Sequence, residues 1–123
     1  MSAPNLVNVA TITAKSDSLL LTGTSATKLL ENTASSGKVI KVNSLVVANV
    51  DGSSAATITV GIYPQDDIAG TPVLIASTIS VPADATLVVI DKNMGYYLEE
   101  DTSIGVTASA ANDLTCHVTY EEL

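Results

Sequence analysis

Apolar and polar residues alternate along several short segments of this chain, and that rhythm constrains its fold more than any other feature. Even-numbered residues are apolar from Ala56 to Ile62, from Ile104 to Ala108 and from Leu114 to Tyr120. Successive side chains of a β-strand point to opposite faces, so a two-residue period predicts strands with one buried face. No segment shows the 3.6-residue period of an amphipathic helix.

The turns between these strands follow from the same parity. In segment 38–50 the residues expected to face inward are Ile40, Val42, Val46, Ala48 and Val50. Directly paired residues of an antiparallel hairpin share a face, so Val50 should pair with Ser54 across a three-residue loop, Asp51-Gly52-Ser53. This loop would place Gly52 or Ser53 in the left-handed conformation. The same reasoning predicts an odd-length hairpin loop containing Asn112-Asp113.

The other expected strands are shorter or less regular. They are 9–15 with 18–22 (one bent strand or two short ones), 27–30, 73–81 and 86–90. Pro64 should end the strand before it, because proline cannot donate to a ladder, and 65–70 should be a polar surface loop. About eight strands at this spacing predict an all-β fold, an antiparallel β-sandwich that is jelly-roll-like.

With 123 residues the chain suits one domain, which we place at 9–123. Residues 1–8 are expected to be either an N-terminal arm that docks on a neighbour or a frayed terminus. Their composition is not that of a signal peptide, which suggests a protein made and used without secretion.

Composition narrows the possible partners. The chain lacks Trp and Phe, so its core must be aliphatic, and its net charge of −8 comes with five Lys and no Arg. Nucleic-acid binding needs Lys and Arg to neutralise phosphates, and anionic membranes also attract basic proteins, so neither partner is expected. No apolar run reaches the roughly 18 residues that would span a bilayer.

The chain offers little equipment for catalysis. Its single Cys116 excludes an intrachain disulfide and a multi-cysteine metal site, and its single His117 is the next residue. Neighbouring residues of a strand face opposite ways, so Cys116 should enter the core and His117 should face outward, without forming a dyad. No nucleophile-elbow motif or phosphate-binding glycine loop is present. We therefore predict no enzyme activity, no cofactor and no metal.

Four residues are candidates for interaction with a partner. Asp66 and Asp67 form an acidic pair; a second pair lies at 121–122 and a run of three acidic residues at 99–101. Carboxylates that are immediate neighbours suit a solvated loop better than a calcium loop or a glycosidase pair, although a weak calcium site stays open. Tyr96 and Tyr97 are the one candidate aromatic platform for a sugar, with one ring packed and the other exposed.

Part of the chain resembles small virion structural proteins of tailed phages, in particular phages of marine cyanobacteria. The segments that carry the resemblance are Lys38 to Gly52, Ala55 to Val60, Tyr97 to Ile104, Thr107 to Leu114 and Val118 to Glu122. It covers roughly 38–122 and leaves 1–37 out. The resemblance implies a β-sandwich subunit present in many copies on the particle, and no catalytic residue can be transferred from it.

Together these features lead us to expect a non-enzymatic capsid decoration, or cement, protein on the outer capsid surface. Its partners would be capsid or other virion proteins and further copies of itself, with a trimer as one arrangement. It would be made in the host cytoplasm and end in the virion. Two alternatives stay open, a tail, neck or fibre component and a carbohydrate- or receptor-binding module.

Overall fold

The computed structural model describes Val9 and residues 11–123, which contain nine strands and one short 3₁₀ turn. The expected arm at 1–8 lies outside the described residues. The elements are β1 (Thr13–Leu20), β2 (Thr27–Asn32), β3 (Ile40–Asn49), β4 (Ala56–Tyr63), β5 (Val73–Val81), β6 (Thr86–Ile90), η2 (Lys92–Met94), β7 (Tyr96–Leu98), β8 (Thr102–Ala108) and β9 (Leu114–Glu122). Strand β1 is one strand where the sequence left two possible, and β4 ends at Tyr63, immediately before Pro64, as expected.

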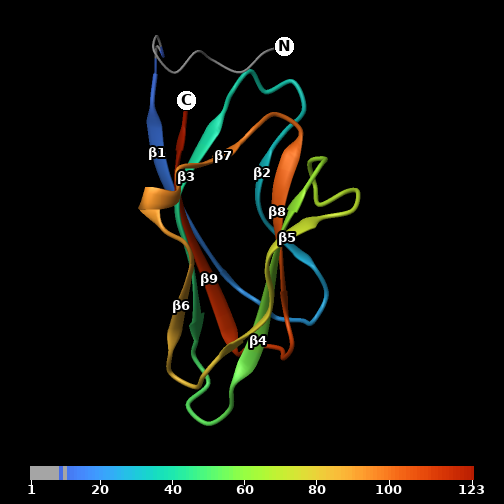
Figure 1. Ribbon diagram of the computed structural model, residues 1–123, viewed down its shortest axis with the longest axis vertical. Helices are drawn as coiled ribbons and strands as arrows, with labels where there is room; N and C mark the ends of the chain where they lie inside the picture. Colours follow the sequence, from blue (N-terminus) through green and yellow to red (C-terminus); the bar gives the residue numbers. More distant parts are fainter. Residues whose placement is uncertain (1–8, 10) are drawn as a thin grey trace.

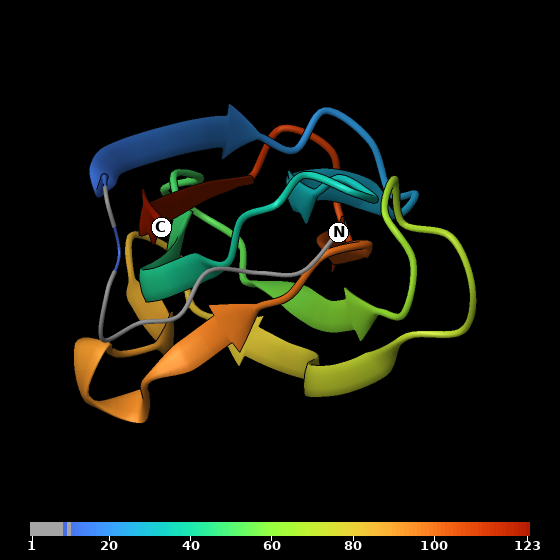
Figure 2. The ribbon, with the colours of Figure 1, turned by 90° about the horizontal axis from the view of Figure 1, so that it is seen from above.

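These strands form two antiparallel sheets that pack face to face (Figures 1 and 2). Sheet A has the order β1-β9-β3-β6, with β7 also paired to β3, and sheet B has the order β2-β8-β4-β5. The pairing is nested as in a jelly roll: β1 with β9, β2 with β8, β3 with β6 and β4 with β5. The prediction of an all-β antiparallel sandwich is therefore confirmed, with nine strands rather than about eight.

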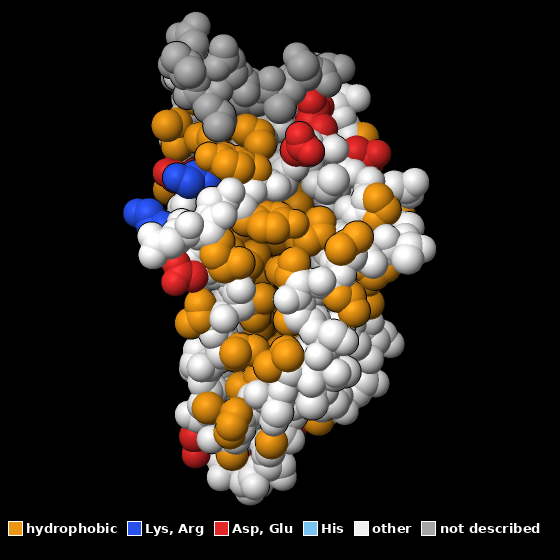
Figure 3. Space-filling view, in the orientation of Figure 1, with side chains coloured by type: hydrophobic (Ala, Val, Ile, Leu, Met, Phe, Trp, Pro, Cys, Tyr) orange, Lys and Arg blue, Asp and Glu red, His pale blue; other side chains and the backbone are white. Residues whose placement is uncertain are grey.

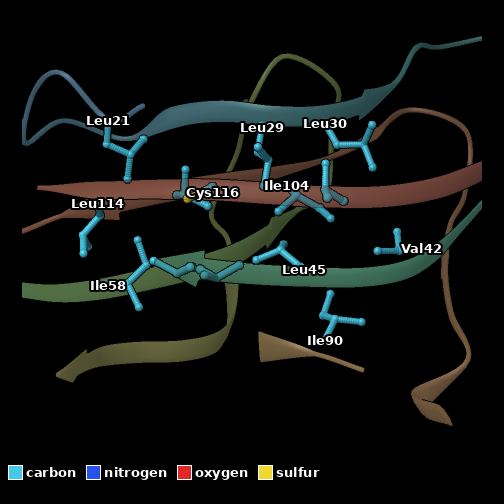
Figure 4. Packing of buried hydrophobic residues seen from close by; sticks show 14 of the residues in the cluster. Leu21, Leu29, Leu30, Val42, Leu45, Ile58, Ile90, Ile104, Leu114 and Cys116 are labelled. Carbon is cyan, nitrogen blue, oxygen red and sulfur yellow. The ribbon is translucent and has the colours of Figure 1, made fainter. Parts of the chain in front are cut away.

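The core between the sheets is aliphatic, as the absence of Phe and Trp requires (Figure 4). Ile58 and Val60 of β4 and Ile104 and Val106 of β8 are fully buried on the inner face of sheet B. From sheet A, the inner residues of β9 reach into the same cluster, with Cys116 at its centre. Each such side chain contributes roughly 1.5–3 kcal/mol relative to an exposed one, which is how a fold without disulfides holds together.

Strand β3 departs from the expected parity in its second half. Ile40 and Val42 are buried as predicted, but Leu45 and Val47 are then buried in place of Val46 and Ala48. The register against β9 shifts between Val42 and Ser44, which marks a β-bulge at Asn43. One extra residue reverses the inward and outward sides beyond it. The predicted inward positions of Val46, Ala48 and Val50 were therefore wrong.

The two predicted hairpins are also wrong, because their strands lie in different sheets. Strand β3 belongs to sheet A and β4 to sheet B, so Asp51-Gly52-Ser53 is part of a crossover between the layers. Val50 is 57% exposed, and neither Gly52 nor Ser53 has a positive φ. The crossover is instead ordered by the Asn49 side chain, which reaches the inner face because of the bulge in β3.

The segment before β9 follows the same pattern. Strand β8 lies in sheet B and β9 in sheet A, so Asn112-Asp113 belongs to a second crossover. Asn112 has a φ of 65°, and its amide donates to the carbonyl of Leu21 at 2.8 Å. Asn112-Asp113 does form a turn, as the sequence predicted. The turn connects β8 of sheet B to β9 of sheet A, because strands of both sheets have to cover the core.

Candidate interaction surface

Cys116 and His117 point to opposite faces of β9, as the alternation predicted. Cys116 is fully buried, and burial raises the pKa of its thiol to about 12, so the nucleophilic thiolate does not form near neutral pH. His117 is exposed on the outer face of sheet A. The two residues cannot act together.

The imidazole of His117 lies between two hydroxyl groups. Its Nδ1 is 3.0 Å from Ser18 Oγ, and its Nε2 is 3.1 Å from Thr115 Oγ1. A Ser–His pair becomes a hydrolytic site only when a carboxylate orients the imidazole and donors stabilise an oxyanion. Here the second ring nitrogen meets another hydroxyl, so this arrangement does not have the partners of a triad.

The part of the chain that the structure describes contains no group of three or more His, Cys, Asp or Glu side chains suited to a metal ion. Within the same residues, no helix is long and apolar enough to cross a membrane.

The acidic candidates lie in the β4–β5 connection, residues 64–72, which is held in place by hydrogen bonds. Asp66 accepts from the amide of Ala34 through Oδ2 at 3.0 Å, and its own amide donates to Asp101 Oδ1 at 3.0 Å. The amide of Asp67 donates to Glu31 Oε2 at 3.0 Å. The expected polar surface loop is thus hydrogen-bonded to Glu31, Ala34 and Asp101.

Asp67 also takes part in an ion-pair cluster. Lys28 Nζ lies 2.8 Å from Glu31 Oε1 and 3.2 Å from Asp67 Oδ1. Hydrogen bonds to Glu31 and to Asp67 raise the pKa of the Lys28 ammonium. The cluster is exposed, and exposed pairs contribute little stability. The cluster joins the loop to β2. The carboxylates of Asp66 and Asp67 thus both have partners within the chain, Ala34 and Lys28.

The same loop packs on the outer face of sheet B over a pair of glycines. Gly61 and Gly105 face each other across β4 and β8. A Cβ at Gly105 would collide with the ring of Tyr63 and would lie 3.1 Å from Ile68 Cγ2. Ser103, which is fully buried, donates to the carbonyl of Gln65 at 2.8 Å and accepts from the amide of Ile68 at 2.9 Å.

The two tyrosines lie on β7, a three-residue strand that pairs with β3. Tyr96 packs against the core, and burial raises the pKa of its phenol, whereas Tyr97 is 41% exposed. Tyr96 therefore has the packed ring and Tyr97 the exposed one. The structure does not bring either ring together with Asp66 and Asp67 in one cavity.

Tyr96 instead borders an apolar pocket of about 300 Å³ at the margin of the sandwich. The other residues that line it come mainly from β4, β5 and the loop between them: Ile62, Tyr63, Pro64, Thr71, Val73, Ile75 and Thr102. None of these side chains carries a charge at neutral pH. Apolar enclosure of this kind suits an aliphatic or aromatic group better than a charged ligand.

Strand β5, at the edge of sheet B, adds exposed apolar surface beside this pocket. Val73 is 74% exposed, and Leu74, Ile75 and Ile79 are also exposed. Sequence reasoning identified β5 as a strand but missed this surface. The available signal was the run Val73-Leu74-Ile75-Ala76, in which apolar residues occupy both parities and one face of a two-layer sandwich cannot bury them all.

Comparisons with known proteins give weak similarities of shape. No protein-family model matches the chain, and no curated protein matches it. Among solved structures, it is similar to a chain of the capsid of Ralstonia phage GP4, with a TM-score of 0.44, 14% identity and coverage of 98% of this chain and 90% of that one. It is also similar to the VP2 subviral particle of infectious bursal disease virus, with a TM-score of 0.39, 12% identity and coverage of 91% of this chain and 32% of that one. The chain thus spans about a third of the VP2 chain, and similarities at these scores assign no function.

Proposed function

We propose that this chain is a non-enzymatic structural subunit of a virus particle, most specifically a capsid decoration protein bound to the outer capsid surface. The observation that carries the proposal is that β5 exposes apolar side chains, whereas Cys116 is buried and His117 is hydrogen-bonded to two hydroxyl groups. The buried thiol of Cys116 and the hydroxyl-bound imidazole of His117 supply no reactive pair. An exposed apolar surface on a stable sandwich supplies a means of adhesion.

The sequence resemblance to virion proteins of tailed phages supports the same proposal, since it implies a β-sandwich subunit present in many copies. Small subunits gain holding strength when many weak contacts act on one particle. The net charge of −8 also supports the proposal, because an acidic subunit does not bind nucleic acid before it reaches the capsid. Its partners would be capsid or other virion proteins and further copies of itself.

The test is quantitative mass spectrometry of purified particles, combined with electron microscopy of particles labelled with an antibody to this chain. Decoration predicts a copy number on the order of hundreds, spread over the capsid, as multivalent attachment requires. A copy number of about a dozen or fewer, with label at one vertex or on the tail, would instead identify a tail, neck or fibre component. Absence from the particles would reject both.

One observation favours a second candidate, a carbohydrate- or receptor-binding module. Tyr97 presents an exposed ring, and an exposed aromatic face is the usual platform for a sugar. Binding on a glycan array that is lost in Tyr97→Ala and retained in Val50→Ala would support this role. A chain that binds no glycan would remove it.

A further inference from the structure

Strand β1 differs from the other eight strands in how little of it is buried. Among the nine strands of the described chain, it is the only one without a buried residue, and seven of its eight residues are exposed. Its remaining residue, Leu19, is partly buried and packs against the core. Figure 3 shows apolar side chains in a strip down the middle of the molecule, whereas β1 runs along its margin (Figure 1). The buried core therefore contains no residue of β1.

We propose that β1 is a separable strap, which opens from β9 while the other eight strands stay folded. Strand β1 lies at the edge of sheet A, and among the described residues β9 is the one strand with which it pairs. A segment that has few buried apolar contacts and whose backbone hydrogen bonds are exposed to solvent opens locally, at a free energy below that of global unfolding. Opening frees the edge of β9 and exposes little apolar surface.

Three side-chain contacts tie β1 to β9 in addition to the backbone ladder. They join Lys15 to Glu122, Asp17 to Tyr120 and Ser18 to His117, over 3.2, 2.9 and 3.0 Å between the heavy atoms. On the β1 side all three residues are exposed, and contacts of exposed groups contribute little stability. The ties therefore fix the register of β1 without making its opening costly.

Most of the groups in β9 that hold β1 keep another partner when β1 opens. Glu122 Oε1 also lies 3.4 Å from Lys38 Nζ, and the ring of His117 also meets Thr115 Oγ1 at 3.1 Å. The hydroxyl of Tyr120 is the group that gives up its partner. Its hydrogen bond to β1 is therefore the tie that most resists opening.

The strap ends at Leu21, the residue directly after β1. The Leu21 side chain is 1% exposed, its amide donates to the carbonyl of Leu114 at 2.9 Å, and its carbonyl accepts from the amide of Asn112 at 2.8 Å. These contacts fasten the chain to the crossover between β8 and β9. Opening therefore stops at Leu20 and leaves the connection to β2 in place.

Amide hydrogen exchange, followed by NMR on the full chain, tests the proposal. The β1 amides that bond to β9 should exchange at least about tenfold faster than the amides of β4 and β8, the inner strands of sheet B. In urea below the midpoint of unfolding, exchange of these β1 amides should stay nearly constant, because the dependence on urea scales with the surface that opening exposes. Exchange of the β4 and β8 amides should accelerate with each increase in urea.

Two substitutions separate local opening from global unfolding. Asp17→Ala removes the partner of the Tyr120 hydroxyl and should accelerate exchange of the β1 amides about fivefold, the usual effect of one hydrogen bond. Asn49 lies in the crossover between β3 and β4, so Asn49→Ala weakens the sandwich equally whether β1 is closed or open. This variant should accelerate exchange in β4 and β8 and leave exchange in β1 unchanged.

Exchange of the β1 amides that is as slow as in β4 and β8, or that depends on urea in the same way, would overturn the proposal. Equal acceleration of β1, β4 and β8 by Asn49→Ala would also overturn it, because β1 would then open only when the whole chain unfolds. These outcomes are independent of the proposed role in a virion, which is tested by the composition of the particles.

Discussion

Tyr120 donates its phenolic hydrogen to Asp17 Oδ2 at 2.9 Å, across the β1–β9 pair at the margin of sheet A. The ring of Tyr120 is almost fully buried and the Asp17 carboxylate is exposed. Burial, followed by the hydrogen bond to Asp17, raises the pKa of the phenol to about 12. The folded chain therefore holds this proton at a pH where the unfolded chain, with a Tyr pKa of 10.0, has lost it.

Removal of this hydroxyl should destabilise the fold slightly and change its response to alkali. Tyr120→Phe should lower the free energy of unfolding by about 1 kcal/mol in urea at neutral pH, the usual net value of one hydrogen bond. The wild type should lose stability as the pH rises from 10 towards 12, because the unfolded state releases the proton first, and the variant should lose less. Tyr97→Phe, at an exposed ring, is the control and should match the wild type.

Cys116 should behave as an inert core residue until the chain unfolds. Iodoacetamide at pH 8.5 should label the thiol in about 6 M urea and leave the native protein unlabelled over the same time, because only the exposed thiol forms thiolate. Labelling of the native protein at the unfolded rate would contradict the burial of this residue. The raised pKa also predicts a loss of stability as the pH rises above 9.0, since the unfolded thiol ionises there and the folded one only near 12.

A comparison of two substitutions separates packing from polarity at this site. Cys116→Ala leaves a small cavity, whereas Cys116→Ser places a hydroxyl among aliphatic side chains, which costs roughly 1–3 kcal/mol if no partner is reached. The serine variant should therefore unfold at a lower urea concentration than the alanine variant. Equal midpoints would show that the site admits water.

Gly105 should tolerate no side chain, because Tyr63 and Ile68 occupy the space over it. Gly105→Ala should displace this packing and lower the free energy of unfolding by about 1–3 kcal/mol. It should also make the 64–72 connection more susceptible to protease, since Tyr63 directly precedes this loop and Ile68 lies within it, and both pack over Gly105. Gly23→Ala is the matched control, because a Cβ at Gly23 would meet nothing within 4 Å and its backbone is free of φ strain. Equal stability of the two variants would contradict the packing of Tyr63 and Ile68 over Gly105.

The inward-facing residues were predicted correctly on β9 but not on β3 beyond its bulge. On β9, strict alternation from Leu114 to Tyr120 predicted each buried residue, because one uninterrupted strand keeps one parity. On β3, apolar residues on both parities concealed the reversal at Asn43, which depends on pairing with β9 more than 70 residues further along the chain. Local turn signals at Gly52 and Asn112 could not show that the next strand joins the opposite sheet.

The candidate residues show a similar division. The separation of Cys116 from His117 needed only the geometry of one strand, and the sequence predicted it. The carboxylates of Asp66 and Asp67 accept hydrogen bonds from Ala34 and Lys28, which are 32 and 39 positions away, so no local pattern could show that they are already engaged. The exposure of Val73 follows from the position of β5 at an edge, which only the sheet order defines.

Asn49 should be among the most sensitive polar residues, because the bulge in β3 turns it into the core. Its amide donates to the carbonyls of Ser54 and Val81, each at 2.9 Å, and its Oδ1 accepts from the amide of Asp51 at 2.9 Å. Asn49→Ala would leave these backbone groups without partners and should lower the free energy of unfolding by about 2–3 kcal/mol in urea. Asn93→Ala, at an exposed position in η2, should change it by less than about 0.5 kcal/mol. Similar losses in the two variants would mean that Asn49 does not order the crossover between the sheets.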